Sequence, residues 1–212
     1  DLHVWFEPDL LPGYAWSFPL PGGRANVGFG VLRGGQVAVG DTGRIWDGLM
    51  DRPAIRAVLG DNARPEGRRS AWPIPARVDA AVLDHGPVLF VGDAASASDA
   101  LTGEGIGQAL QTGILAAEAA LAGGTAAEVA STYARSVRRD LVADHTMSVA
   151  LQGMLASPAG ARMALWATAL VPWTRRNFAR WLFEDYPRAL LATPRRWKRG
   201  SLSAPGAYAG SD

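Results

Sequence analysis

The 212-residue sequence contains no cysteine, which excludes disulfide bonds, thiolate metal sites and a cysteine nucleophile, and fits a cytoplasmic protein. Its three histidines, His3, His85 and His145, are scattered and lack the spacing of metal ligands, so each is expected to be structural. No run of apolar residues approaches the roughly 18 that a membrane-spanning helix needs. The first residues do not resemble a signal peptide. We therefore expect neither a metal site nor a membrane span.

The sequence does contain enough apolar residues for a core, 48% of a chain long enough for one large domain or parts of two. Its most informative segment covers residues 88–121. This segment opens with an apolar run at 88–91, typical of a buried strand, which ends at Gly92 and Asp93. After several small residues, the string TGEGIG at 102–107 leads into an alanine-rich helical pattern. This order predicts a strand, a loop and the start of a helix.

The predicted loop has the composition of a site for a large polar ligand. Gly103, Gly105 and Gly107 lack side chains where a planar ring would lie against the main chain. Unpaired amides at the helix start favour negative charge, such as that of a reduced flavin. The Asp93 carboxylate accepts hydrogen bonds and suits the hydroxyls of a ribityl chain. The alternative is that the glycines only form a tight turn, which is the preferred interpretation of an isolated motif.

The strings VGDAA and LTGEGIGQAL together resemble the second flavin motif of the FAD-dependent monooxygenase and geranylgeranyl reductase superfamily, the p-hydroxybenzoate hydroxylase-like flavoproteins. One departure is that Ala100 stands where this motif usually has a proline. The resemblance implies FAD as the cofactor. The residues that it places at the FAD site are Gly92, Asp93, Ala94, Thr102, Gly103, Glu104, Gly105, Ile106 and Gly107.

A second motif lies near the start of the chain, where two strands joined by a Pro-Gly-Gly turn are predicted. Alternation places Tyr14, Trp16 and Phe18 on one face of the first strand. Gly28 and Gly30 share a face of the return strand, where bare backbone leaves room for a ligand. Periodicity alone favours the alternative, an ordinary half-buried strand pair with the aromatic residues in its core.

The string PGYAWSFPLPGGRANVGFGV resembles a signature of the substrate-binding domain of geranylgeranyl reductases. The matching residues are Pro12, Tyr14, Trp16, Phe18, Pro19, Val27, Gly28 and Gly30. The resemblance implies that an apolar substrate contacts Tyr14, Trp16, Phe18, Gly28 and Gly30. Tyr14 is the candidate for a proton donor, and no other catalytic residue is assigned.

The remaining stretches are predicted from pattern alone. Residues 41–52 are expected to form a polar connection, and residues 52–59 a short helix. The helix at 109–122 carries a single charge and is expected to be buried against a sheet on most sides. Thr125 can cap a further helix that reaches about Leu155.

The end of the chain differs in charge. Residues 162–199 include nine basic and two acidic residues, a net charge of +7, and four of the eight tryptophans, Trp166, Trp173, Trp181 and Trp197. A basic, tryptophan-rich segment of this kind suits an anionic membrane surface. The equal alternative is a surface helix that packs its aromatic side chains on the protein itself.

Together the motifs predict a mixed α/β fold, the carboxyl-terminal part of a two-domain FAD-binding flavoprotein of the glutathione reductase and hydroxylase type. Residues 1–78 are assigned to the antiparallel sheet of a substrate-binding domain, residues 79–160 to the second half of the FAD-binding domain, and residues 161–212 to a C-terminal helical region and tail. No GxGxxG follows a strand near the start. We therefore expect the chain to be part of a longer enzyme.

The resemblance implies FAD-dependent reduction of carbon–carbon double bonds in a polyprenyl (geranylgeranyl-type) lipid or quinone side chain, with electrons from NAD(P)H or a redox protein. The expected location is cytoplasmic, with peripheral contact at the inner face of the membrane, and no nucleic-acid partner is expected. Two alternatives stay open. One is a flavin-dependent monooxygenase of an aromatic or polyketide substrate, and the other is an inactive fragment that lacks the N-terminal GxGxxG.

Overall fold

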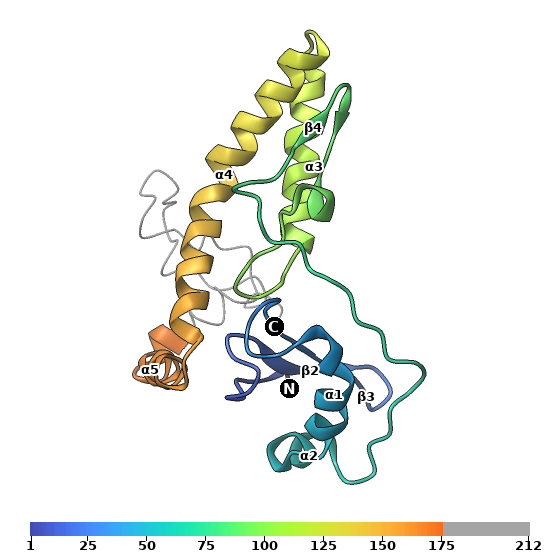
Figure 1. Cartoon of the computed structure of the whole chain (residues 1–212), viewed down its shortest axis with the longest axis vertical. Coiled ribbons are helices and arrows are strands. Elements are labelled where there is room, and N and C mark those ends of the chain that lie inside the picture. Colours follow the sequence, from blue (N-terminus) through green and yellow to red (C-terminus); the bar gives the residue numbers. More distant parts are fainter. Residues whose placement is uncertain (176–212) are drawn as a thin grey trace, which may run out of the picture. The chain divides into compact units, whose positions relative to one another are not determined.

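The computed structural model describes residues 1–175, which divide into two compact units. The first unit comprises Asp1–Trp72 with Met154–Arg162, and the second comprises Pro73–Gly153 with the described residues from Met163 onward. Figure 1 follows the chain through both, from the blue N-terminus to the orange helix α5. Each unit has its own cluster of buried apolar side chains. The substrate and cofactor roles assigned to the domains remain predictions.

The first unit is built on a three-stranded antiparallel sheet in the order β1-β2-β3, which confirms the predicted antiparallel sheet. Its strands are β1 (His3–Trp5), β2 (Tyr14–Leu20) and β3 (Arg24–Gly30). The turn between β2 and β3 places Gly22 at φ +77° and Gly23 at φ +70°, a left-handed conformation that glycine adopts without strain. The pairing puts Trp16 directly opposite Gly28.

Two helices, α1 (Thr42–Met50) and α2 (Pro53–Leu59), contribute apolar side chains to this unit's core. The expectation of a polar connection at 41–52 was wrong. Ile45 and Leu49 lie one helical turn apart and join the core around the fully buried Ala15 on β2, so their burial stabilises a helix that its glycines disfavour. The predicted second helix is confirmed, and its C-cap Gly60 has φ +86°.

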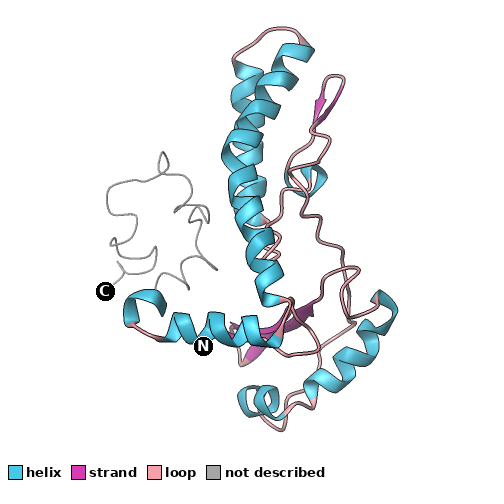
Figure 2. Cartoon of the chain, turned by 60° about the vertical axis from the view of Figure 1, so that its left-hand side comes forward, coloured by secondary structure: helices cyan, strands magenta, loops and turns pink. Residues whose placement is uncertain are grey.

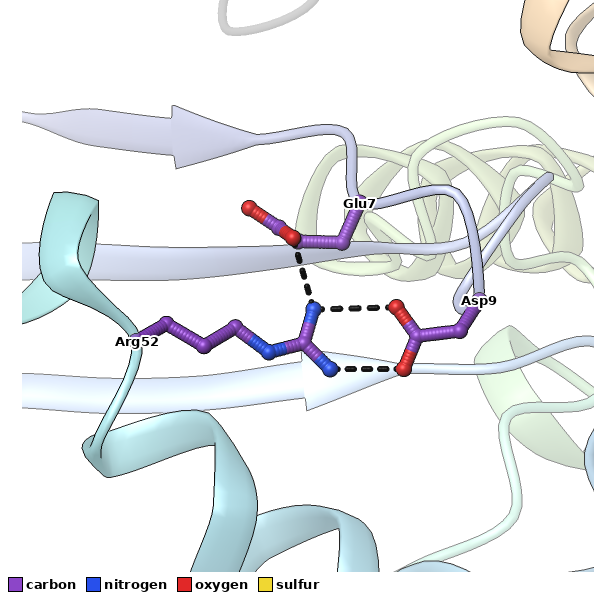
Figure 3. A network of polar contacts seen from close by, with 3 residues as sticks. All are labelled: Glu7, Asp9 and Arg52. Carbon is purple, nitrogen blue, oxygen red and sulfur yellow. Dashed lines mark hydrogen bonds and ion pairs between the residues drawn. The ribbon is translucent and has the colours of Figure 1, made fainter.

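A cluster of charged side chains ties the segment after β1 to the start of α2 (Figure 3). Arg52 Nη1 donates to Glu7 Oε2 at 2.7 Å, and the two terminal nitrogens of Arg52 bind the Asp9 carboxylate at 2.9 and 2.6 Å. The hydrogen bond from Arg52 lowers the pKa of Asp9, against the opposing effect of burial. This bidentate pair fixes the loop that precedes β2.

The second unit begins with a short β-hairpin and continues with long helices, which Figure 2 shows in cyan. Its elements are β4 (Asp84–His85), β5 (Val88–Leu89), the 3-10 helix η2 (Gly92–Ala95), α3 (Ile106–Leu121) and α4 (Ala126–Leu155). Helix α5 (Pro158–Ala169) follows, with its residues up to Arg162 in the first unit and those from Met163 in the second. The buried strand predicted at 88–91 is shorter than expected, and Val88 is 52% exposed, because β5 pairs only with β4 among the described residues.

Helices α3 and α4 lie side by side in Figures 1 and 2, and their contact forms the core of the second unit. Leu115 and Ala119 of α3 pack with Tyr133 and Val137 of α4. The Tyr133 hydroxyl donates to the carbonyl oxygen of Phe90 at 2.6 Å, and burial raises the pKa of this tyrosine. This hydrogen bond joins the end of the β4–β5 hairpin to α4.

The predicted cap of α4 is confirmed. The Thr125 hydroxyl accepts from the Glu128 amide at 3.4 Å, while a Glu128 carboxylate oxygen accepts from the Thr125 amide at 2.8 Å. This reciprocal pair is a capping box. It satisfies backbone groups that the first turn of a helix otherwise leaves without partners.

The prediction that α3 is buried on most sides was wrong for the part of the chain that the structure describes. Ile106, Leu110 and Ile114 are 73%, 65% and 58% exposed. They follow one another at intervals of four residues and so share a face. The contacts of α3 with α4 lie on another face, which carries Leu115 and Ala119.

The described residues include neither a membrane-spanning helix nor a cluster of metal-binding side chains. None of their helices combines the length and the apolar character needed to cross a membrane. No group of three or more His, Cys, Asp or Glu side chains in this part of the chain could hold a metal ion.

Candidate functional site

The predicted site residues fall into two regions, one in each unit. We call residues 92–107 the glycine-rich loop. We call the side of the sheet that carries Tyr14, Trp16, Phe18, Gly28 and Gly30 the aromatic face.

The glycine-rich loop begins with Gly92, which packs directly on α3. Its φ is +54°, and a β-carbon at this position would lie 3.1 Å from that of Ala109. The Gly92 amide donates to the buried hydroxyl of Thr112 at 2.9 Å. A side chain is therefore excluded both by backbone conformation and by the approach of the helix.

The structure brings Asp93 and Gly105 together. Asp93 is exposed, and its Oδ1 accepts a hydrogen bond from the Ser98 hydroxyl at 2.9 Å. A β-carbon on Gly105 would lie 2.9 Å from Ser98 Oγ and 3.5 Å from Asp93 Oδ1. Gly105 is also the N-cap of α3. A carboxylate thus stands beside the positive end of a helix, with oxygen atoms exposed for further hydrogen bonds.

Asp99 organises the middle of the loop, and the sequence reasoning missed it. Its side chain is 95% buried, and its Oδ2 accepts from the amides of Leu101 and Thr102 at 3.1 and 2.7 Å and from the Thr102 hydroxyl at 2.7 Å. Its Oδ1 accepts from the hydroxyl of Ser148 on α4 at 2.5 Å. The pattern Asp-x-x-Thr is typical of such a local turn and could have indicated the first three contacts.

The remaining predicted residues complete the turn into α3. Gly103 has φ +72°, and a β-carbon there would lie 3.1 Å from Cδ1 of Ile74. Glu104 Oε1 accepts from the Ile106 amide at 2.8 Å. The Ile106 amide is therefore not among the unpaired amides expected at the helix start, since it donates to the protein's own carboxylate. Ala94 is exposed and its side chain can make only apolar contact.

Unpaired polar groups lie at the first turn of α3. Within residues 1–175, no acceptor is found for the N–H groups of Gly107 and Gln108. Gln108 Oε1 is buried and also has no hydrogen-bond partner in this part of the chain. Two amide donors, an orphaned amide oxygen and the exposed Asp93 carboxylate fit a ligand with an anionic edge and a polyol chain.

The glycines themselves have a simpler explanation. Gly92, Gly103 and Gly105 each face atoms of the protein's own chain at 2.9 to 3.1 Å. The positive φ of Gly92 and Gly103, and the approach of Ser98 to Gly105, favour glycine here whether or not a ring lies against the loop. The support for a ligand comes from the unpaired polar groups and not from these three glycines.

The aromatic face is held together by ring contacts. The ring centroids of Tyr14 and Trp16 are 6.0 Å apart, as are those of Trp16 and Phe18, and Phe6 lies 5.9 Å from Tyr14. All three predicted aromatic residues of β2 are half-buried, whereas Ala15 and Ser17 between them face the core. The predicted alternation is confirmed.

Of the two glycines on this face, a side chain covers Gly28 but not Gly30. A β-carbon on Gly28 would lie 2.4 Å from Cζ2 of Trp16, so the indole itself covers this glycine. The indole is held there by a hydrogen bond from its Nε1 to Asn26 Oδ1 at 2.9 Å. Gly30, by contrast, has no atom within 4 Å of the position of a β-carbon. The space expected above two glycines is present above Gly30 alone.

Comparison with known proteins points to one family. The chain is 36% identical over 119 residues to digeranylgeranylglycerophospholipid reductase 1 of Methanopyrus kandleri, a match that covers 56% of this chain and 30% of the relative. It is 36% identical over 126 residues to a menaquinone reductase of Mycobacterium tuberculosis, covering 53% of this chain and 28% of the relative. Part of this chain is homologous to the geranylgeranyl reductase family.

Other relatives have similar coverage. A digeranylgeranylglycerophospholipid reductase of Methanothrix thermoacetophila is 33% identical over 140 residues, covering 63% of this chain and 33% of the relative. The chain thus spans about a third of the length of the geranylgeranyl reductase homologues that it matches. No protein-family model matches the chain, and no solved structure matches it.

Proposed function

We propose that this chain carries the second half of the FAD site and part of the substrate surface of a reductase that saturates carbon–carbon double bonds in a polyprenyl lipid or quinone side chain. The observation that carries the proposal is the partial homology to reductases of digeranylgeranylglycerophospholipids and of menaquinone. The fold proposed for the complete protein is a two-domain FAD-binding flavoprotein.

The glycine-rich loop would hold the cofactor. Asp93 presents an exposed carboxylate that can accept hydrogen bonds from the ribityl hydroxyls, and the amides of Gly107 and Gln108 can donate to an anionic ring edge. When bound, reduced FAD supplies a hydride to one carbon of the double bond. The chain's own contribution is to orient the cofactor and to stabilise negative charge at the start of α3.

The aromatic face would hold the prenyl chain. Tyr14, Trp16 and Phe18 offer half-buried ring surface, and the open space at Gly30 lies on the same side of the sheet. Apolar surface of this kind excludes water from the reacting double bond. The second hydrogen must arrive as a proton at the other alkene carbon, and Tyr14 is the candidate donor because its hydroxyl is the one acid among the three rings.

The basic end of the chain would bring the enzyme to its lipid. Of residues 162–199, the structure describes those up to 175, where Trp166 and Trp173 are 65% and 47% exposed. Trp181 and Trp197 lie outside the described residues. We propose reversible contact with an anionic membrane surface at the cytoplasmic side. Co-sedimentation should then occur with anionic vesicles, should weaken as salt is raised, and should not occur with neutral vesicles.

Product analysis tests the reaction. The complete polypeptide that contains this chain is incubated with FAD, NAD(P)H or a reduced redox protein, and a geranylgeranyl lipid or menaquinone, with and without oxygen. A reductase adds two hydrogen atoms per double bond in both atmospheres. A product heavier by one oxygen atom, formed only in air, would show a monooxygenase. FAD binding without turnover of any lipid would contradict the proposed reaction but not the proposed cofactor.

A further inference from the structure

Helix α4 presents three polar side chains to the glycine-rich loop and the segment before it. His145, Ser148 and Gln152 are spaced by three and four residues, so they share one face of the helix. Ser148 is fully buried and His145 is 93% buried. Each of the three side chains has at least one polar partner, although the buried Nδ1 of His145 has none in the described part of the chain.

The partners of Ser148 and Gln152 lie on adjacent residues of the loop. The Ser148 hydroxyl donates to Asp99 Oδ1 at 2.5 Å, and Gln152 Nε2 donates to the carbonyl oxygen of Ala100 at 2.5 Å. Both contacts join residues about fifty positions apart in the sequence. They fix the loop to the helix from two successive turns.

His145 makes the third contact, to the segment that precedes the hairpin. Its Nε2 lies 3.0 Å from Asp79 Oδ1. Two residues earlier, the Arg77 amide donates to the carbonyl oxygen of Ser96 at 3.0 Å, next to the bridge between Ala76 and Ala97. The face of α4 thus holds the glycine-rich loop and the strand-like segment beside it at once.

A continuous path of hydrogen bonds runs from Ser148 to the start of α3. Asp99, which binds Ser148, accepts from the Thr102 hydroxyl, and that hydroxyl accepts from the Glu104 amide at 3.2 Å. Glu104 in turn accepts from the Ile106 amide. Hydrogen bonds therefore link Ser148 to the first turn of α3, in addition to the packing of Gly92 against Ala109. The core cluster includes Ala95 and Ala97 but no side chain from residues 98–105.

We propose that this face of α4 positions the cofactor loop, with Ser148 as the main positioning residue. The proposal rests on the proposed FAD site. Ser148 does not touch the ligand. It sets the distance between Asp93 and the first amides of α3, and so adjusts two groups that contact the cofactor together.

The test compares Ser148→Ala with Ser131→Ala in the complete polypeptide. Ser131 lies on the same helix, but it is exposed and its hydroxyl oxygen accepts from Arg135, so both variants lose one serine hydroxyl from α4. Two quantities are measured, namely amide hydrogen exchange at residues 99–106 without FAD and the Kd for FAD. Ser148→Ala should speed exchange at these amides and weaken FAD binding about tenfold. Ser131→Ala should change neither.

The two measurements separate the proposals. Unchanged amide exchange at residues 99–106 in Ser148→Ala would overturn the positioning role. Faster exchange with an unchanged Kd for FAD would also overturn it. If the unaltered protein does not bind FAD, the proposed cofactor is wrong, and the exchange data still decide whether Ser148 holds the loop. Should Ser148→Ala fail to fold, Gln152→Ala, which loses only the bond to Ala100, should give the same two effects at a smaller size.

Discussion

The glycine-rich loop and the aromatic face differ in what holds their side chains in place. In the loop, the Asp99 carboxylate accepts hydrogen bonds from Leu101, from Thr102 and from Ser148 on helix α4. On the aromatic face, the indole hydrogen bond to Asn26 is accompanied by ring contacts at about 6 Å. The loop is positioned by directional bonds, whereas the face is positioned mainly by contact between rings.

The difference fits two kinds of ligand. A hydrogen-bonded loop keeps donors and acceptors at fixed distances, which a polar cofactor with a defined shape requires. Aromatic rings offer large apolar surfaces that make few directional bonds, which suits a flexible apolar chain. Substitutions that add a single carbon atom to each region should therefore have different effects.

The largest effect is expected for Gly105→Ala. The new β-carbon would lie 2.9 Å from Ser98 Oγ, so the hydroxyl must leave Asp93. We expect a loss of about 2 kcal/mol of unfolding free energy, because a charge-assisted bond is lost at a crowded site, and FAD binding weaker by about tenfold or more. Chemical denaturation and FAD titration measure both.

A matched control is available on the same helix. Gly113 in α3 has no atom within 4 Å of the position of a β-carbon, so Gly113→Ala should raise stability by about 0.5–1 kcal/mol and leave FAD binding unchanged. Equal changes in stability and FAD affinity for Gly105→Ala and Gly113→Ala would contradict the close contact of Gly105 with Ser98.

A smaller effect is expected on the aromatic face, where Gly28→Ala and Gly30→Ala form a second pair. The β-carbon of alanine at 28 would lie 2.4 Å from the indole of Trp16, so the ring must move. We expect the free energy of unfolding to fall by about 1–2 kcal/mol. Alanine at 30 meets no atom within 4 Å and should leave stability nearly unchanged. Thermal unfolding measures the contrast.

The Gly30→Ala variant also tests whether the substrate lies on the aromatic face. If a prenyl chain occupies the space above Gly30, Gly30→Ala should raise the KM for the lipid while leaving FAD affinity as it was. An unchanged KM would place the substrate elsewhere.

The smallest effect concerns the charged cluster around Arg52. Because Arg52 lowers the pKa of Asp9 below its ordinary value of 3.8, the pair stabilises the fold above about pH 4 and loses this contribution as the pH falls through the lowered value. Asp9→Asn should reduce stability at pH 7 by about 0.5–1 kcal/mol, since the Asp9 side chain is 54% exposed and screened by solvent.

The pH profile is the critical readout for this cluster. The difference between Asp9→Asn and the unaltered protein should shrink below pH 4 and vanish in stronger acid. A difference that stays constant from pH 7 to the acid limit would show that Asp9 contributes by packing and not by charge.

Local patterns allowed much of the fold to be predicted. Alternation and the Pro-Gly-Gly turn correctly indicated the β2–β3 hairpin, and Thr125 correctly marked the start of α4. Helix α1 was missed because its glycines and charges conceal an apolar pair, Ile45 and Leu49, whose burial depends on the sheet. The exposed face of α3 was misjudged because composition shows how apolar a helix is, but not which partner covers it.

The candidate site could be predicted only where its residues are near in sequence. Asp93 and Gly105 were singled out from one motif, and the structure places them side by side, although their role toward FAD stays a prediction. The contact of Ser148 with Asp99 could not be predicted, because it depends on how α4 packs on the loop.

The central claim is that the glycine-rich loop binds FAD through Asp93. The most direct test is an FAD titration of the complete polypeptide, unaltered and as Asp93→Ala, with Glu118→Ala as a control that removes an exposed carboxylate from α3. Loss of the hydrogen bonds to Asp93 should weaken FAD binding by about ten- to a hundred-fold, and Glu118→Ala should not change it. Equal FAD affinity in Asp93→Ala and the unaltered protein would contradict the account.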